Sequence, residues 1–493
     1  MSGLFGSGFT GNSALALLLG APLLGGLLTA LLPGRRTAAP LTVLSSLLSL
    51  LAACILLQDR PTPGLFLQVD EFSTVMIALI SFVAFTSSLY SAGYIGHEWS
   101  AGRIDIHRSR LYHTMYHGLI FALNLGLSAN NIGLMWVAIE LATLTAVLIV
   151  GLYRTPEALE AAWKYFILGS VGVALALFGT ILVYFAAADV VGEGLEAMAW
   201  TVLVARAAEF DPTLLNPAFI FLLLGYGTKA GLVPLHAWLP DAHAEGPTPI
   251  TAVLSGLLIN VSLYVILRFK MVLAVNPHVL PPGPLMIGLG LLSVLFASLM
   301  LYRRRDIKRL FAYSSIEHMG LCAFAFGIGG PLANFAGLLH IAMHSLTKAA
   351  IFFAVGHAVQ IKGTQQVSGI RGLSESHPAL GWGLAAGVLA IAGLPPFGVF
   401  TSEFLLISAS FARAPLPTFL LILGLLLALG AMLLRLNDVV FGSPEDEGPA
   451  RTGTLSFGYM APLVLHLSPV LVAGIYLPPP LVAWLRHVAE LLG

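Results

Sequence analysis

Long apolar stretches, separated by short polar connections, repeat along the chain. A helix needs about 20 mainly apolar residues to cross the hydrocarbon core of a bilayer, and roughly 14 stretches approach that length. Examples lie at residues 14–32, 72–92, 131–152, 285–302 and 415–440. The pattern predicts an all-α polytopic membrane protein with about 14 transmembrane helices.

Composition supports the membrane prediction and limits the chemistry that this chain can carry. Of the 493 residues, 57% are hydrophobic and 10% are charged, and the formal net charge is +0. The neutral balance gives no reason to expect nucleic-acid binding. The two cysteines, Cys54 and Cys322, lie far apart in apolar stretches, so we expect no disulfide framework and no cysteine-ligated cluster. We also expect no cleavable signal, because no basic region precedes the first apolar stretch.

Basic residues predict the orientation in the membrane. Most of them follow odd-numbered spans, which the positive-inside rule places in the cytoplasm, so both termini are predicted to face outward. Arg268 and Lys270, which we place after span eight, go against this pattern. The residues that agree with it are Arg35, Arg36, Arg103, Arg108, Arg110, Arg154, the basic residues between 303 and 309, Lys362, Arg371 and Arg435.

Two polar segments have amphipathic character. Residues 194–210 and 481–493 alternate apolar and charged positions in a helical pattern. Such helices lie on a membrane surface or on a partner, although both segments could equally cap the helix bundle.

Two apolar segments are interrupted by similar sequences. "AGLVP" occurs at residues 230–234 beside Lys229, and "AGLPP" occurs at residues 392–396 near Glu403. Paired breaks of this kind indicate an inverted-repeat transporter with its ion site at the breaks. We therefore predict two inverted five-helix repeats. The predicted divisions are an N-terminal three-helix region at 1–112, a first repeat at 113–270, a second repeat at 271–441, and a last helix with an amphipathic tail at 442–493.

Four ionisable residues fall inside predicted spans: Glu140, Lys229, Lys348 and Glu403. A charge at mid-membrane costs about 2.5 to 3.5 kcal/mol, so four would cost about 10 to 14 kcal/mol. That sum is comparable to the stability of a whole domain. A structural salt bridge could account for one pair, but four residues on four spans favour a conduction path. At Lys229, exposed carbonyl groups at the helix end favour the charged form of the side chain, whereas desolvation favours the neutral form. Because these effects oppose each other, the charge of a neighbouring residue could decide whether Lys229 binds or releases a proton.

A second group combines histidines with a lysine. His340, His344 and Lys348 are four residues apart, which predicts a stripe about 12 Å long on one helix face. The stripe could pass a proton through intervening water. The H-x-x-x-H spacing alone is a weak metal signal, and axial haem ligation by His318, His340 or His344 is chemically possible.

Polar residues also flank two other predicted helix ends. His236, Asp241 and His243 follow the first break, where they could line a proton exit or cap a helix. Asp70 and Glu71 open span three and are expected to form an N-cap.

Several motifs resemble a known family. They are "MWVAIE" at 135–140, "GTKAGLVPLHAWLPDAHAEGPTPITAVLSG" at 227–256, "RRDIKRLFAYSSIEHMG" at 304–320 and "HSLTKAAIFF" at 344–353. The sequence is similar to the antiporter-like proton-pumping subunits of respiratory complex I, Mrp-type cation/proton antiporters and membrane-bound group 4 hydrogenases, and most similar to the hydrogenase-4 branch. The resemblance extends from about residue 70 to residue 440.

The resemblance implies a 14-helix fold with broken seventh and twelfth helices. It places the family's fifth-helix glutamate on Glu140, its seventh-helix lysine on Lys229 and its twelfth-helix exit residue on Glu403. The central-axis residues fall on His318, His340, His344 and Lys348. Asn260 departs from the pattern, because complex I relatives often have a lysine in span eight. The proton would then pass from Lys229 through another titrating group or through water held by Asn260.

The resemblance also implies a role within a larger assembly. We expect a proton-translocating subunit without a redox centre of its own, in a prokaryotic cytoplasmic (inner) membrane. Its partners would be other antiporter-like and small membrane subunits and a soluble redox arm, which would carry the iron-sulfur clusters and a NiFe or flavin centre. The alternatives are a cation/proton (Na⁺/H⁺) antiporter component, a haem-bearing quinone oxidoreductase subunit, and a scaffold subunit that conducts nothing.

Overall fold

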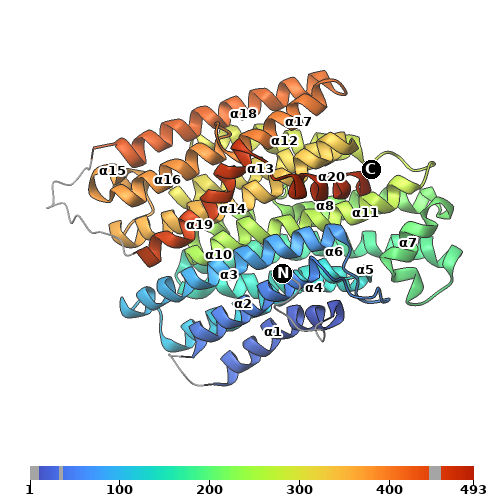
Figure 1. Ribbon diagram of the computed structural model, residues 1–493, viewed down its shortest axis with the longest axis horizontal. Coiled ribbons are helices and arrows are strands. Elements are labelled where there is room, and N and C mark those ends of the chain that lie inside the picture. The colour runs from blue at the N-terminus through green and yellow to red at the C-terminus, as the bar shows by residue number, and fades with distance from the viewer. Residues whose placement is uncertain (1–9, 33–36, 444–456) are drawn as a thin grey trace. The chain divides into compact units, whose positions relative to one another are not determined.

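The computed structural model describes residues 10–32, 37–443 and 457–493 (Figure 1). Within these ranges the chain consists of helices and connecting segments, with isolated β-bridges but no β-strand. The prediction of an all-α protein is confirmed for this part of the chain. Arg35 and Arg36, on which part of the orientation argument depends, lie outside the described residues.

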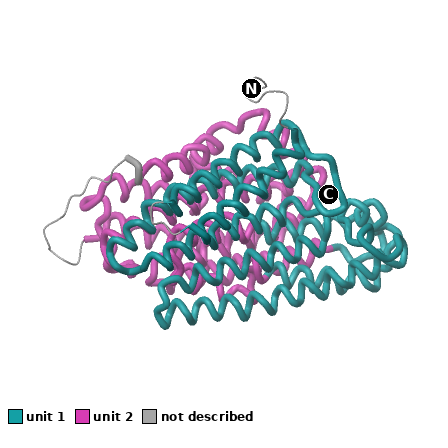
Figure 2. Tube along the Cα trace, turned by 90° about the horizontal axis from the view of Figure 1, so that it is seen from below, with its two compact units in different colours: residues 1–227, 261–281 teal, residues 228–260, 282–493 magenta. Residues whose placement is uncertain are grey.

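The chain forms two compact units, which Figure 2 shows in different colours. Unit 1 comprises Met1–Gly227 and Val261–Pro281, and unit 2 comprises Thr228–Asn260 and Pro282–Gly493. Helices α8 (Pro212–Ala230) and α11 (Ile259–Val275) belong mostly to unit 1. The other helices of unit 1 are α1 Gly11–Leu31, α2 Ala38–Leu56, α3 Glu71–Ser100, α4 Ile106–Ser128, α5 Ile132–Val150, α6 Pro156–Val191 and α7 Trp200–Arg206. Those of unit 2 are α9 Trp238–Glu245, α10 Thr248–Val253, α12 Gly283–Leu301, α13 Ile307–Ile328, α14 Gly330–Lys362, α15 Leu373–Ser376, α16 Pro378–Ile391, α17 Gly398–Phe411, α18 Pro415–Leu436, α19 Phe457–Ile475 and α20 Pro479–Leu491.

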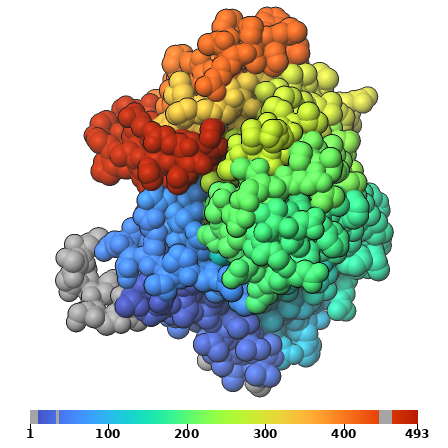
Figure 3. Space-filling view, turned by 90° about the vertical axis from the view of Figure 1, so that its right-hand side faces the viewer, coloured from blue at the N-terminus to red at the C-terminus, as the bar shows by residue number. Residues whose placement is uncertain are grey.

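Length and hydropathy identify a multi-pass membrane protein. Nine helical segments of the described chain are long and apolar enough to cross a bilayer, or ten if the bent α19–α20 pair is one span. The 33-residue helix α14 has 94% of its most apolar window buried inside the protein, whereas α18 has only 33%. Figure 3 shows the orange surface, the colour of the chain around α17 and α18, at the upper edge of the view.

Polar side chains fix where several helices begin. Asp70 caps α3, because its carboxylate accepts a hydrogen bond from the Ser73 backbone N–H at 2.8 Å, and the predicted N-cap is thus confirmed. Asp105, Asn131 and Asp306 cap α4, α5 and α13 in the same way. These bonds satisfy backbone donors that the first helical turn leaves unpaired.

Arg268 and Lys270 lie inside α11, so their predicted position in a loop after span eight is wrong. The helix continues through Arg268 because this guanidinium has partners. It donates two hydrogen bonds of 2.6 Å to the Asp70 carboxylate and lies 4.3 Å from the Trp200 ring centroid. Burial would raise the pKa of Asp70, but the charge of Arg268 and the hydrogen bonds from Arg268 and Ser73 lower it to about 2.

Both amphipathic segments form short helices. Within residues 194–210, α7 lies between two 3-10 turns, Glu196–Met198 and Ala207–Glu209. The C-terminal helix α20 is attached to α14 in unit 2, where the Asn334 side-chain amide donates hydrogen bonds to the carbonyl oxygens of Ala489 and Gly493. The described structure therefore gives α20 an intramolecular contact.

Candidate functional site

The first break lies between α8 and α9. Helix α8 ends at Ala230, and Gly231 follows with a φ of 77°. This left-handed conformation suits glycine, and a Cβ atom at this position would also lie only 2.7 Å from Leu239 Cδ1. Lys229 is therefore in the last turn of a half-helix, as predicted, and its side chain is fully buried.

The backbone around the first break is supported by side chains of unit 2. The Trp238 indole N–H donates to the Thr228 carbonyl oxygen at 2.7 Å, and the Val233 N–H donates to Ser293 Oγ at 2.9 Å. Both bonds satisfy backbone groups that a continuous helix would pair internally. Specific side-chain hydrogen bonds therefore stabilise the break.

Glu140 lies near the middle of α5 in unit 1. The residue as a whole is partly buried, and its Oε2 atom is buried. One face of α5 is exposed, as the 47% exposure of Val137 and the 42% exposure of Leu144 show. Glu140 interacts electrostatically with Tyr165 of α6.

Three imidazole rings form a histidine cluster in unit 2: His318 of α13, and His340 and His344 of α14. Ring centroids are 5.1 Å apart for His318–His340, 5.4 Å for His318–His344 and 6.5 Å for His340–His344. All three rings are buried. The predicted stripe on α14 is present, and α13 adds His318 to it.

Hydrogen bonds define the protonation pattern of two rings. The Ser402 hydroxyl donates to the Val399 carbonyl oxygen, so Ser402 Oγ accepts the bond from His340 Nδ1 at 2.9 Å. His340 Nε2, in the neutral ring, then accepts from His318 Nδ1 at 2.9 Å. The remaining nitrogen, His318 Nε2, lies 3.9 Å from Glu317 Oε2, and the ring also interacts with the backbone of Ile391.

Lys348 continues the stripe one turn beyond His344 and is fully buried. Its ammonium group donates a 2.9 Å hydrogen bond to the Phe311 carbonyl oxygen and lies 5.6 Å from the centroid of the Phe311 ring. It also interacts electrostatically with the carboxylate of Glu317. Among the described residues, the two ring nitrogens of His344 make no hydrogen bond.

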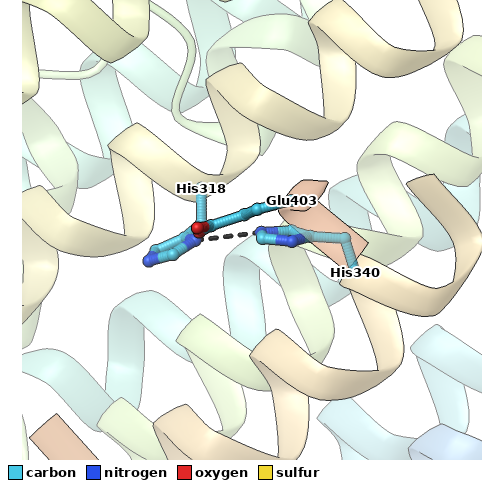
Figure 4. A group of neighbouring side chains, drawn as sticks. All are labelled: His318, His340 and Glu403. Atoms are coloured by element: carbon cyan, nitrogen blue, oxygen red, sulfur yellow. Dashed lines mark hydrogen bonds between the residues drawn. The ribbon is translucent and has the colours of Figure 1, made fainter. Parts of the chain in front are cut away.

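The second break separates α16 from α17 and holds Glu403. Gly393 has a φ of 67°, and a Cβ atom there would overlap Glu403 Oε2. The Glu403 carboxylate therefore lies directly against the backbone of the break. It is 8% exposed, and one of its oxygens lies within 4.8 Å of nitrogen atoms of both His318 and His340 (Figure 4).

His318, His340 and Glu403 offer the atom types that bind metal ions. The direct bond between His318 Nδ1 and His340 Nε2, drawn in Figure 4, joins two of the nitrogens that a metal between the rings would need. The other His340 nitrogen is bonded to Ser402. The arrangement is that of a hydrogen-bonded chain.

Asn260 is the second residue of α11, which begins directly after the π-helical turn Leu254–Leu258. Its side-chain amide donates hydrogen bonds of 2.7 Å to the Gly256 carbonyl oxygen and to Ser345 Oγ of α14. Asn260 Oδ1 is buried and has no partner among the described residues. A buried acceptor of this kind is suited to binding a water molecule.

The three polar residues after the first break have different surroundings. The His236 ring packs edge-on against Phe296, with centroids 4.9 Å apart. Asp241 forms an ion pair with Arg309 at 3.2 Å. His243 is fully buried, and its ring interacts with the backbone of Leu239.

His243 lies between two lysines of unit 2, since it interacts electrostatically with Lys348 and with Lys308. The Lys308 ammonium donates to the carbonyl oxygens of Ala244 and Gly246, at 2.8 and 2.6 Å, at the end of α9. His243 thus interacts both with Lys348, at the end of the His340–His344–Lys348 stripe, and with Lys308, near the start of α13. Within the described chain, His236 has no such interaction with either lysine.

Sequence reasoning missed Glu317, which is 3% exposed and next to His318. The signal was present, because Glu317 lies inside an apolar stretch. It also missed His113 and His117 of α4 in unit 1, whose ring nitrogens lie 3.0 and 3.3 Å from Thr42 Oγ1. Their four-residue spacing is the same signal that identified His340 and His344.

Comparisons with known proteins agree with this architecture. Residues 129–429 match the family model for the transmembrane region of NADH:quinone oxidoreductase and Mrp antiporter subunits, and residues 64–103 match the model for the N-terminus of chain 5 of NADH-ubiquinone oxidoreductase (complex I). The hydrogenase-4 component F homolog of Methylacidiphilum infernorum (isolate V4) is 58% identical, over 97% of this chain and 100% of the relative.

Two solved structures have the same fold. A chain of the archaeal membrane-bound sulfane sulfur reductase superposes with a TM-score of 0.84 at 24% identity, covering 97% of each chain. A chain of respiratory complex I from Thermus thermophilus superposes with a TM-score of 0.79 at 23% identity, covering 97% of this chain and 100% of that chain. The protein belongs to the NADH:quinone oxidoreductase/Mrp antiporter family of membrane subunits.

Proposed function

We propose that this chain is a proton-translocating membrane subunit of a redox-driven complex that resembles complex I or a membrane-bound hydrogenase. The observation that carries the proposal is the histidine cluster, with Lys348 one helical turn beyond it and Glu403 within 4.8 Å of two of its rings. Ionisable groups inside a membrane protein are costly and mark proton or ion pathways. The family membership and the 58% identical hydrogenase-4 component F homolog support the same role.

The hydrogen bond between His318 and His340 defines one step of the proposed proton transfer. A proton that reaches His318 Nε2 makes this ring cationic, and the ring can pass its Nδ1 proton to His340 Nε2 along the 2.9 Å bond. Such a transfer needs only small movements, because donor and acceptor are already aligned. Glu403 then receives the proton at the second break and releases it.

Lys229 and Glu140 form the switch in this proposal. At an effective dielectric constant near 20, the electrostatic interaction between a lysine and a carboxylate about 7 Å away is roughly 2.4 kcal/mol. Forming or breaking such a pair changes the proton affinity of the lysine more than tenfold. A signal from a neighbouring subunit would separate the pair and release the proton of Lys229 toward Lys348. Asn260 would hold a water molecule on this route, and His243 would connect Lys348 to the surface near Asp241. His236 would have only a packing role.

The proposal includes the topology and the setting. We infer about 14 spans in two inverted five-helix repeats, at 113–270 and 271–441, with a three-helix region before them and a terminal helix after them. The two breaks support the repeats, since each has a glycine with positive φ within two residues of the end of a half-helix. The setting would be a prokaryotic cytoplasmic membrane. Other antiporter-like and small membrane subunits and a soluble redox arm would be the partners, and iron-sulfur clusters with a NiFe or flavin centre would lie in those partners.

Substitution of Lys348 tests the proposed function in the intact complex in proteoliposomes. We expect Lys348→Ala to lower the number of protons moved per electron pair about tenfold or more, while electron transfer measured with an uncoupler continues. Unchanged proton transfer would refute the relay. Repeating the assay without sodium tests the cation/proton antiporter alternative, which predicts that transport stops. An absorption spectrum of the purified subunit tests the haem alternative, which predicts a Soret band.

A further inference from the structure

A second carboxylate lies beside the path described above. Glu317 of α13 is 3% exposed and was not among the expected site residues. On one side it interacts electrostatically with Lys348, and on the other side with Glu403. Its Oε2 atom lies 3.9 Å from His318 Nε2.

Glu317 and Glu403 line the same small cavity in unit 2. The rest of the wall comes from the end of α16, from Ala392 in the second break, and from apolar side chains of α18. The cavity has about 10 Å³ of free volume, which is close to the least that admits one water molecule. Four carboxylate oxygens can supply the polar contacts that such a water needs.

Two carboxylates so close to each other in an apolar wall do not both ionise, because the like charges repel in a low dielectric. One proton shared between them removes that repulsion. A single water in the cavity can join the two groups, since it accepts a hydrogen bond from the protonated carboxyl and donates one to the ionised carboxylate.

We propose that Glu317 carries the proton from Lys348 to Glu403 through one water molecule in this cavity. Before the transfer, Glu317 holds the shared proton and Glu403 is ionised. In the first step the Glu317 acid gives its proton to the water, and the water gives another proton to the Glu403 carboxylate, which leaves Glu317 ionised and the water restored. In the second step the Lys348 ammonium gives a proton to the Glu317 carboxylate, which leaves a neutral amine, and Glu403 then releases its proton.

This inference rests on the proposed function and extends it by one residue and one water site. The surroundings explain why Glu317 suits the task. Lys348 stabilises its ionised form, while His318 Nε2 and the cavity can both receive its proton.

The test uses the intact complex in proteoliposomes, with Glu317→Gln, Glu317→Asp and Lys348→Ala measured in parallel. We expect Glu317→Gln to lower the protons moved per electron pair about tenfold or more, and Glu317→Asp to retain part of the yield. Glu160→Gln is the matched control, because Glu160 is an exposed residue of α6 paired with Lys164, and it should behave as the wild type. A normal yield in Glu317→Gln together with a loss in Lys348→Ala overturns this inference alone, whereas normal yields in both refute the proposed function.

Two further measurements separate proton transfer from a structural role. Infrared difference spectra in H₂O and D₂O should show one protonated carboxyl band that both Glu317→Gln and Glu403→Gln remove or shift, and two independent bands would overturn the shared proton. Ala428→Leu fills the cavity from α18 and leaves both carboxylates in place. We expect it to reduce the proton yield, and a wild-type yield would overturn transfer through the cavity water.

Discussion

Arg268 and Lys348 are both buried cations, but their partners differ. Arg268 has a carboxylate at 2.6 Å and aromatic rings around it. Lys348 donates instead to a backbone carbonyl and shares its environment with the imidazoles of His243, His318 and His344 and with one carboxylate, all of which can exchange protons. The first arrangement holds a charge in place, and the second is suited to releasing a proton.

The Asp70–Arg268 pair predicts a pH-dependent stability. The pKa of Asp70 falls from an ordinary 3.8 to about 2 in the folded chain. The ionised carboxylate therefore contributes about 2 kcal/mol above pH 4, and this contribution disappears as the pH falls toward 2. We expect Asp70→Asn to lower the unfolding free energy in detergent by about that amount at pH 7, and to flatten its pH dependence between pH 4 and 2. A variant as stable as the wild type at pH 7 would contradict this role.

Asn260 gives a second prediction at this scale. Asn260→Leu removes the bond to Ser345 and the buried Oδ1 acceptor, so we expect about a tenfold lower proton yield in the reconstituted complex. Ser345→Ala is the control, since it removes the hydroxyl but leaves Asn260 Oδ1 in place. Equal losses in the two variants would argue that the hydrogen bond, and not the water site, is what matters.

Residue patterns within one helix were predictable from the sequence, and contacts between helices were not. The four-residue spacing of His340, His344 and Lys348 places them on one face, because 3.6 residues make one turn. Nothing in that spacing shows that His318 donates to His340, or that Glu317 and Glu403 line one cavity. Arg268 was misplaced for the same reason, because its partner Asp70 is 198 residues away in the chain.

At the scale of elements, the two breaks control where the charged groups lie. Glycines with positive φ follow α8 and α16, and each break has an ionisable side chain close by, Lys229 at the first and Glu403 at the second. The sequence predicted both breaks because glycine and proline interrupt apolar runs. It did not predict that the 194–210 segment contains only a seven-residue helix, since amphipathic periodicity does not reveal 3-10 turns at both ends.

Gly393→Ala tests the geometry of the second break. The added methyl group would overlap Glu403 Oε2, and the backbone is left-handed, which alone costs about 1 to 2 kcal/mol for other residues. We expect the proton yield to fall to the level of Glu403→Gln. The control is Gly288→Ala in α12, where a Cβ atom would meet nothing within 4 Å. A normal yield in Gly393→Ala would show that the position of the Glu403 carboxylate is not critical.

For the whole molecule, the sequence motifs already identified the family, and the comparisons confirm it over 97% of the chain. The helical class and the multi-pass character were predictable because apolar stretches of spanning length dominate the chain. In the two compact units Thr228–Asn260 belongs with the second half of the chain, and the repeat boundary at residue 270 stays a prediction. Contacts of the segment after the first break explain this grouping. One of them is the Lys308 ammonium, which donates hydrogen bonds to the carbonyl oxygens of Ala244 and Gly246 at the end of α9.

Proton translocation depends, in this account, on a charge pair in which Glu140 controls whether Lys229 holds its proton. The direct measurement is the number of protons moved per electron pair by the intact complex in proteoliposomes, after Lys229→Ala and, separately, after Glu140→Ala. We predict that both variants keep uncoupled electron transfer and lose about tenfold or more of the proton yield. A wild-type yield in both variants would contradict the account.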